Sequence, residues 1–348
     1  MRNLGYNMVK IWMKINLHLY FGRIEKHGLC NVPKNQPVLF LPNHQNALLD
    51  VLLIAVDCNR KPWFLTRSDV FKSKTLKTIF DFFQMIPIYR IRDGRESLKN
   101  NQAVFDRCTE LLLKKEALLM FPEANHNLKR RVRPLSKGFT RILFNTLNQN
   151  DTIDIQIVPI GINYNNATLF PDRVSIYFDT PISVRELYDE TDVKSSIDRI
   201  KDVVSNQLKT VTTHIEDEEN YDIKLAQLHA QNADFLNPIE TNLKLQQLHS
   251  EQVELPAKSA ALFSKIFRLV FHVLNFPVLL LWKYYFKPKV WEAEFMGTLR
   301  FAFSLISFPI YYICFFVILS IVVGNTIAIG GTLSLFLFNT AFVKIYKT

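Results

Sequence analysis

The chain contains 348 residues with a formal net charge of +10, and its first 150 residues hold 25 Lys and Arg against 11 Asp and Glu. This length suits one large domain with appendages, and the charge favours anionic lipid, a phosphorylated substrate or nucleic acid as a partner. The four cysteines are scattered without a Cys-x-x-Cys pair, which argues against a zinc knuckle or a disulfide framework.

Residues 1–22 are predicted to form an amphipathic helix on a membrane surface. Its apolar side chains recur at helical spacing: Met8, Trp12, Ile15 and Leu19. Lys10 and Lys14 lie elsewhere around the turn and interrupt the apolar stretch, so no secretory signal is expected. A helix packed on its own domain is the alternative.

Residues 23–183 alternate short apolar runs with longer helical stretches, which predicts an α/β domain with a mixed, largely parallel sheet flanked by helices. Strands are expected at 37–41, 63–66, 85–89, 117–121, 155–162 and 174–178. Helices are expected at 47–56, 97–115 and 136–147.

The rest of the chain is predicted to be helical. Residues 184–258 are polar and Gln-rich, and their acidic run at 216–219 suits an exposed face of a solvated extension. Residues 259–348 form a predicted membrane region. Within it, 269–282 has basic residues at both ends, which favours an interfacial or re-entrant helix over a third span, with a buried core helix as the alternative.

Residues 301–343 contain no Asp, Glu, Lys or Arg, and Gly324-Asn325 divides them into two apolar runs. Each run is long enough to cross about 30 Å of hydrocarbon, so a transmembrane hairpin is predicted. Arg300 and Lys344 flank it, and the positive-inside tendency places both ends, with the catalytic domain, on the cytoplasmic side of the cell (inner) membrane.

His44, at the end of an apolar run, is the first candidate for chemistry. It stands in the segment Leu-Phe-Leu-Pro-Asn-His-Gln-Asn-Ala-Leu-Leu-Asp, residues 39–50. A histidine is suited to general-base work near neutral pH, and a carboxylate on its far nitrogen fixes the tautomer. Because a six-residue helical separation would put the side chains about 120° apart, His44 is expected on the loop and Asp50 on the following helix. A capping Asn43 beside a bystander histidine is the alternative.

Three further segments give the histidine a context. Residues 84–90 form a predicted strand that ends in Arg90, before Arg92, and the planar fork of arginine matches phosphate oxygens. A buried-strand pattern ends at Pro122-Glu123, where the carboxylate could accept hydrogen bonds from a polyol.

The last segment is Lys137-Gly138 at the opening of a helix, followed by Val158-Pro159-Ile160. A cation beside a helix N-terminus favours an anion.

In this order the segments resemble the glycerolipid acyltransferases of the bacterial lysophosphatidate acyltransferase (PlsC-like) type, over about residues 36–182. The family pattern is Asn-His-(four residues)-Asp, Gly-x-Ile-(Phe or Pro)-x-x-Arg, Phe-Pro-Glu-Gly-(Thr or Asn) and Val-Pro-(Ile or Val). The resemblance implies a glycerol-3-phosphate acyltransferase-like fold with His44 and Asp50 as the catalytic dyad. It implies Arg90 as the acceptor-phosphate ligand and Glu123 as the acceptor-site carboxylate. The predicted substrate-binding set is completed by Asn43, Arg92, Lys137 and Gly138.

The chain departs from this pattern at three places. Five residues separate His44 from Asp50, and Gln84 and Ala124 stand where the pattern has glycine. A bulged loop would absorb the extra residue, so the dyad is expected to form. A positive φ at position 84 or 124 would be costly for a residue with a side chain.

These features predict a membrane-bound enzyme that moves a fatty acyl group from acyl-CoA or acyl-carrier protein to the hydroxyl of 1-acyl-glycerol 3-phosphate. Backbone N–H groups near Pro159 or Lys137 are expected to stabilise the oxyanion. No bound cofactor is expected, and no metal, because Glu123 and His126 make only a single i, i+3 pair.

Alternative acceptors are glycerol 3-phosphate and an amino-acid lysolipid. A non-catalytic membrane scaffold is a second alternative. Nucleic-acid binding is disfavoured because the C-terminal region is predicted to insert in lipid.

Overall fold

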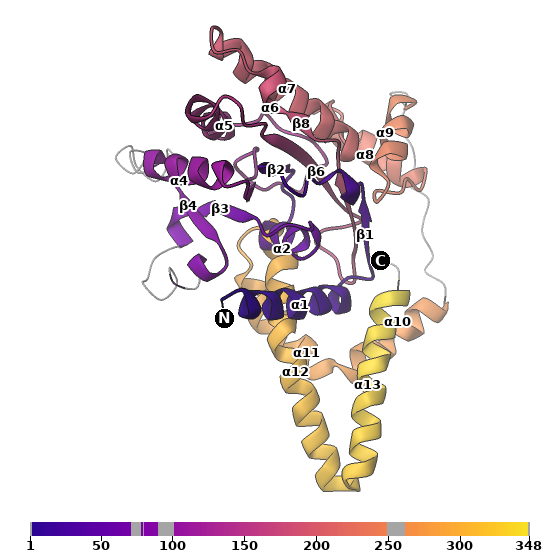
Figure 1. Cartoon of the computed structure of the whole chain (residues 1–348). Helices are drawn as coiled ribbons and strands as arrows, with labels where there is room; N and C mark the ends of the chain where they lie inside the picture. The colour runs from indigo at the N-terminus through magenta and orange to yellow at the C-terminus, as the bar shows by residue number, and fades with distance from the viewer. Residues whose placement is uncertain (1, 71–77, 79, 90–100, 249–261, 347–348) are drawn as a thin grey trace.

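The computed structural model describes residues 2–70, 78, 80–89, 101–248 and 262–346. An α/β domain forms one end of the molecule, and a long pair of C-terminal helices projects from it (Figure 1). Arg90 and Arg92, the predicted ligands of the acceptor phosphate, lie outside the described residues.

An eight-stranded sheet, in the part of the chain described, lies at the centre of the domain in the order β1-β7-β6-β2-β5-β3-β4, with β8 paired to β6. Strand β6 runs antiparallel to β7 and β8, and the other pairs are parallel. This confirms the predicted mixed, largely parallel sheet. The strands are β1 (Arg23–His27), β2 (Val38–Pro42), β3 (Trp63–Arg67), β4 (Met85–Ile88), β5 (Ala117–Leu119), β6 (Gln156–Tyr164), β7 (Arg173–Phe178) and β8 (Ile182–Ser183).

Helices cover both faces of the sheet. Helices α4 (Asn101–Leu113), α5 (Gly138–Gln149) and α7 (Val193–Val211) bury their apolar residues against one face, and α1 (Arg2–Tyr20) and α2 (Ala47–Asp57) against the other. Because successive side chains of a strand alternate, Leu39 and Leu41 of β2 join the first core, and Val38 and Phe40 join the second. Strand β2, which leads to His44, is therefore fixed from both sides.

The polar segment after β8 is part of this domain, and the expectation of a solvated extension is wrong for α7. Ile200, Val204 and Leu208 of α7 are fully buried in the core. A Cβ on Gly161 of β6 would lie 1.9 Å from the carbonyl oxygen of Val211, so only glycine allows this approach. The segment also contains α6 (Val184–Leu187), α8 (Tyr221–Ala230) and α9 (Pro238–Gln246). Helix α7 is polar on average, but its apolar residues form one stripe that packs into the core. The average composition of the segment does not reveal this stripe.

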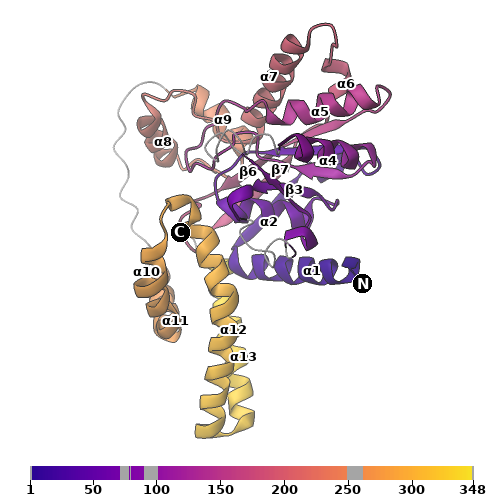
Figure 2. The same cartoon turned by 90° about the vertical axis from the view of Figure 1, so that its left-hand side faces the viewer.

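Two C-terminal helices, α12 (Met296–Val323) and α13 (Asn325–Ile345), form the predicted hairpin, with Gly324 at φ 85° between them. Both are long and apolar enough to cross a membrane. The preceding α10 (Leu262–Leu274) and α11 (Phe276–Leu281) lie beside them and belong to a pair bent by 85°, as a broken or re-entrant segment would be (Figure 2). Phe263 and Leu269 of α10 are largely exposed, so this segment is not a buried core helix.

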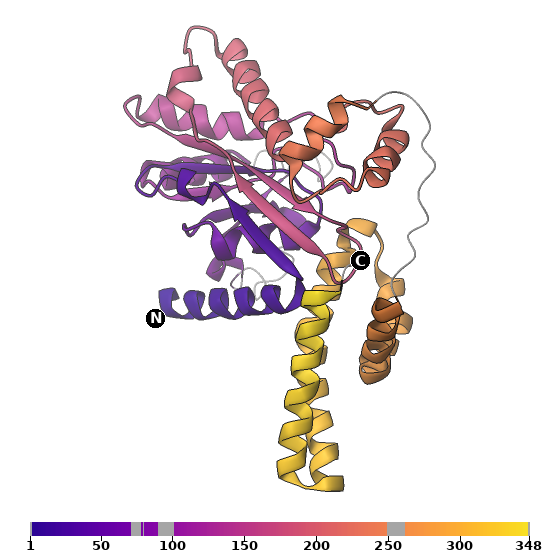
Figure 3. The same cartoon turned by 90° about the vertical axis from the view of Figure 1, so that its right-hand side faces the viewer.

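Helix α1 lies across the end of the domain from which the hairpin projects (Figure 3). One side buries Tyr6, Leu17 and Tyr20 against the domain. The other side exposes a row of large apolar residues: Leu4, Met8, Ile11, Trp12 and Ile15. The helix therefore packs on its own domain, the alternative interpretation. Its outward apolar face is compatible with the membrane-surface helix, which stays a prediction.

Candidate active site

His44 and Asp50 form a hydrogen-bonded pair at the carboxyl end of β2. The loop after β2 presents His44, and Asp50 stands in the first turn of α2, as predicted. His44 Nδ1 lies 2.8 Å from Asp50 Oδ2. The aspartate is fully buried, whereas the histidine side chain is 14% exposed. With Nδ1 facing the carboxylate, Nε2 is the nitrogen that can take a proton.

Four donors surround the Asp50 carboxylate. Besides His44, the backbone N–H groups of Gln45 and Asn46 each donate to Oδ2 at 2.8 Å. The hydroxyl of Tyr164 donates to Oδ1 at 2.7 Å. Burial, with the charge of Asp50, raises the pKa of Tyr164 well above its ordinary value, so this hydroxyl stays a donor. The carboxylate is thus fixed from three sides.

The loop absorbs its extra residue as a bulge before α2. Asn46 has φ −135° and ψ 56°, and Ala47, the first residue of α2, has φ 36°. This irregular turn points the backbone N–H groups of residues 45 and 46 at the carboxylate that follows. The five-residue spacing is therefore compatible with the pair.

A second loop, residues 121–127, packs over the histidine. The ring of Phe121 stacks on His44 at 3.7 Å between centroids, and the ring of His126 meets it edge-on at 5.5 Å. The N–H of Asn127 donates to the His44 carbonyl at 2.9 Å. These contacts hold His44 against the second loop.

Glu123 is buried in this second loop, and its carboxylate is occupied by Arg133. Oε2 accepts from the guanidinium at 2.7 and 3.1 Å, and Oε1 accepts from the Arg133 backbone at 3.3 Å. Burial raises the pKa of Glu123, and the cation of Arg133 opposes that rise. Glu123 was predicted to accept hydrogen bonds from a polyol. In the structure its carboxylate binds Arg133 and so organises the loop that carries this arginine.

Gln84 and Ala124, which replace glycines of the family pattern, both adopt left-handed backbone conformations. Their φ angles are 60° and 64°. An L-residue in this region costs about 1 kcal/mol relative to glycine. The backbone shape expected at these positions is thus kept in spite of the side chains.

The remaining predicted site residues that the structure describes lie in the sheet or at the start of α5. The amide of Asn43 is used by β6, accepting from Ile162 N at 2.7 Å and donating to its carbonyl at 3.1 Å. Lys137 is exposed at the N-cap of α5, which Gly138 opens. Pro159 lies inside β6, opposite Leu41 of β2, so the neighbouring N–H groups belong to the sheet. An oxyanion site at Pro159 is therefore not supported.

A small pocket opens beside His44 and is lined by basic residues that sequence reasoning missed. Lys129, Arg130 and Arg131 line it together with Asn43, His44, Gln45 and Glu123. Arg130 is held by the carbonyls of Tyr164 and Asn165 at 3.0 and 2.8 Å, and burial lowers its pKa to about 10. Lys129 is exposed, and Arg131 is partly buried and pairs with Glu218 at 2.6 Å. The run of basic residues at 129–133 is the feature of the sequence that could have predicted this basic lining.

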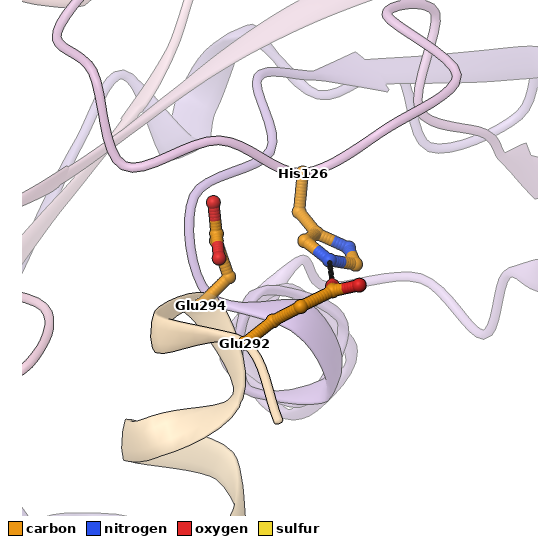
Figure 4. A group of neighbouring side chains, drawn as sticks. All are labelled: His126, Glu292 and Glu294. Atoms are coloured by element: carbon orange, nitrogen blue, oxygen red, sulfur yellow. Dashed lines mark hydrogen bonds and ion pairs between the residues drawn. The ribbon is translucent and has the colours of Figure 1, made fainter. Parts of the chain in front are cut away.

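His126 is paired with a carboxylate from the C-terminal region, not with Glu123. Its Nε2 lies 2.8 Å from Glu292 Oε2, and Glu294 brings a third possible metal-ligand atom within 4.8 Å of the other two (Figure 4). The segment before α12 thus reaches the loop that covers His44. A separation of 166 residues put this pairing beyond sequence reasoning.

A buried carboxylate that orients a partly exposed histidine, at the carboxyl end of a strand in a largely parallel sheet, is an arrangement suited to general-base chemistry. Residues 23–163 match the model of the family described as Acyltransferase. The part of the chain that carries the His44–Asp50 pair is therefore similar to the acyltransferase family.

Several curated proteins are similar to this chain over part of its length. One from Schizosaccharomyces pombe, described as an uncharacterized acyltransferase, is 27% identical over 33% of this chain and 18% of its own. A chloroplastic 1-acyl-sn-glycerol-3-phosphate acyltransferase of Brassica napus is 24% identical over 46% and 43% of the two chains. The mitochondrial glycerol-3-phosphate acyltransferase 1 of Rattus norvegicus is 23% identical over 47% and 21%. The chain spans less than half the length of these relatives.

Among solved structures, the 1-acyl-sn-glycerophosphate acyltransferase PlsC from Thermotoga maritima matches with a TM-score of 0.42 and 16% identity. The match covers 60% of this chain and 81% of that one.

Proposed function

We propose that the protein is a membrane-bound O-acyltransferase that transfers a fatty acyl group from a thioester donor, acyl-CoA or acyl-carrier protein, to the hydroxyl of 1-acyl-glycerol 3-phosphate. The product is phosphatidate. The observation that supports this most is the 2.8 Å contact between His44 Nδ1 and the buried Asp50 carboxylate, within the part of the chain that is similar to the acyltransferase family.

The proposed reaction needs no covalent acyl-enzyme. His44 Nε2 removes the proton of the acceptor hydroxyl as its oxygen attacks the thioester carbonyl, and Asp50 stabilises the imidazolium that forms. The tetrahedral intermediate then collapses, the C–S bond breaks, and the imidazolium returns its proton to the leaving thiolate. Backbone N–H donors of a loop stabilise the oxyanion.

Basic side chains at the pocket support an acceptor that carries phosphate. Lys129 and Arg131 line the same pocket as His44, and Arg90 and Arg92 remain predicted ligands. A phosphate held there would bring the acceptor hydroxyl to the base and make the attack effectively intramolecular.

The C-terminal hairpin and the exposed face of α1 support a membrane location. Both ends of the hairpin meet the domain, where Lys344 Nζ donates to the His18 and Phe21 carbonyls at 2.6 and 2.9 Å. The apolar face of α1 then lies where the domain meets the bilayer, suited to a lysolipid that enters from the membrane. The basic residues that flank the hairpin support the proposal that this domain lies on the cytoplasmic side of the cell (inner) membrane.

An assay with labelled acyl donor tests the proposal. Purified full-length protein in detergent is given acyl-CoA or acyl-carrier protein with 1-acyl-glycerol 3-phosphate, glycerol 3-phosphate or an amino-acid lysolipid. We expect transfer to 1-acyl-glycerol 3-phosphate. Preference for glycerol 3-phosphate, the acceptor that the rat relative's name gives, would favour that alternative. An absence of acyl transfer to every acceptor tested would favour a non-catalytic membrane scaffold.

A further inference from the structure

The first turn of α12 touches the loop that carries the His44–Asp50 pair. Thr298 Oγ1 accepts from the backbone N–H of Leu49 at 3.2 Å and donates to the carbonyl of Asn46 at 3.2 Å. Thr298 is only 8% exposed, and Asn46 2%. A hydroxyl of the membrane-anchor helix therefore bridges two backbone groups of α2's first turn.

Those two groups flank the bulge that positions Asp50. Asn46 donates its N–H to Asp50 Oδ2, and the left-handed Ala47 lies between Asn46 and Leu49. An L-residue at positive φ persists where surrounding contacts over-determine it. The Thr298 hydroxyl is one of these contacts, and it comes from a residue 249 positions beyond Leu49.

Gly297 packs so closely against the Asn46 side chain that an added Cβ would require the Asn46 amide to shift. A Cβ there would lie 2.5 Å from Asn46 Nδ2 and 3.1 Å from the Ala167 carbonyl. On its other side, the Gly297 carbonyl accepts from the Tyr20 hydroxyl at 3.3 Å. The helix start is thus clamped between α1 and the catalytic loop.

The residues just before α12 reach the second loop over His44. Glu292 pairs with His126 (Figure 4). The ring of Phe295 meets the His126 ring edge-on at 4.9 Å. Residues 292–298 therefore contact both loops that hold the base. Their placement depends on α12, which is long and apolar enough to cross a membrane.

We infer that Thr298 is a positioning residue for the acyl-transfer reaction, through which the membrane anchor holds the loop that aims Asp50 at His44. The inference rests on the proposed function. The docking of α12 holds the backbone of Asn46 and Leu49 in place. These two residues flank the bulge at Ala47, and the bulge in turn sets the position of the Asp50 carboxylate. Since a misplacement of about 1 Å can cost about 100-fold in rate, losing one such contact is expected to lower turnover clearly.

The test compares Thr298→Val, which keeps the shape and removes both hydrogen bonds, with Thr298→Ser, which keeps the hydroxyl. Ser304→Ala is the matched control, because the Ser304 hydroxyl lies in the same helix and donates to the Phe301 carbonyl of that helix at 2.8 Å. We expect T298V to lower kcat about 10-fold, with KM for donor and acceptor changed less than about 2-fold. T298S and S304A should stay near wild type.

Wild-type kcat in T298V, or an equal loss in T298S, would overturn the inference. If T298V does not purify as a folded protein, Gly297→Ala, which crowds Asn46 from the neighbouring position, carries the same expected loss of kcat. Amide hydrogen exchange at residues 45–50 should be faster in T298V than in S304A, and unchanged exchange would also overturn it. Exchange needs no turnover, so a wild type without acyl transfer would refute the proposed function alone.

Discussion

Replacing Asp50 with Asn removes the charge of the buried carboxylate while keeping its shape. Asp50 Oδ2 accepts from His44, Gln45 and Asn46 at 2.8 Å each, and Oδ1 accepts from Tyr164 at 2.7 Å. The Asn amide nitrogen can take the place of Oδ1, because the Tyr164 hydroxyl can rotate to accept. The remaining oxygen then keeps all three donors at Oδ2.

The expected effect on turnover is much larger than the effect on folding. Hydrogen bonds to a charged group contribute about 1.5–3 kcal/mol and neutral ones about 0.5–1.5 kcal/mol, so D50N should lower the free energy of unfolding by about 1–3 kcal/mol. The imidazolium formed during proton transfer loses its counter-charge in a buried site. We expect kcat to fall about 10²- to 10⁴-fold.

The assay measures kcat and KM for acyl transfer, beside thermal unfolding in detergent. Asp57→Asn is the control, because Asp57 is a second buried aspartate of α2 that pairs with Lys14 and Lys26 at 2.7 and 3.3 Å and does not touch His44. D57N should lower stability with kcat near wild type. A kcat loss of equal size in both variants, or wild-type kcat in D50N, would contradict the proposed role of the Asp50 charge.

Three further outcomes follow from the conformations and charges around the site. Ala124→Gly should raise the free energy of unfolding by about 0.5–1 kcal/mol, because glycine removes the left-handed strain at φ 64°; a loss of stability would contradict this. Arg133→Met should cost about 2–4 kcal/mol in unfolding, since Glu123 is left buried without its cation, and adding Glu123→Gln should restore most of it. Burial raises the pKa of Asp172 from 3.8 to about 6, so the folded state binds the extra proton and wild-type stability falls as pH rises from about 4 to 6. Asp172→Asn should therefore gain up to about 3 kcal/mol relative to wild type between pH 4 and 7, and a pH-independent gap in unfolding midpoints would refute it.

The sequence predicted the pair at the site because both partners are local. An apolar run encodes β2, Pro42-Asn43 ends it, and a second apolar run encodes α2, so His44 and Asp50 had to lie on adjoining elements. The glycine positions of the family pattern also marked where the backbone turns left-handed, and Gln84 and Ala124 keep that shape.

The partners that complete the site come from distant parts of the chain, which local patterns do not encode. Tyr164 lies 114 residues from the Asp50 it binds, and Thr298 lies 249 residues from Leu49. Strand β1 was missed for a local reason, because three of its five residues are charged, as edge strands often are. Tertiary packing also buries the apolar stripe of α7, whose average composition is polar.

In the proposed function, His44 is the base for acyl transfer to a lipid hydroxyl. The most direct measurement is the single-turnover rate of acyl transfer to 1-acyl-glycerol 3-phosphate, compared between wild type and His44→Ala at matched folding and membrane location. We expect the wild type to form phosphatidate and H44A to lose at least about 100-fold in rate, the contribution of a general base. A wild-type rate in folded H44A would contradict this role of His44.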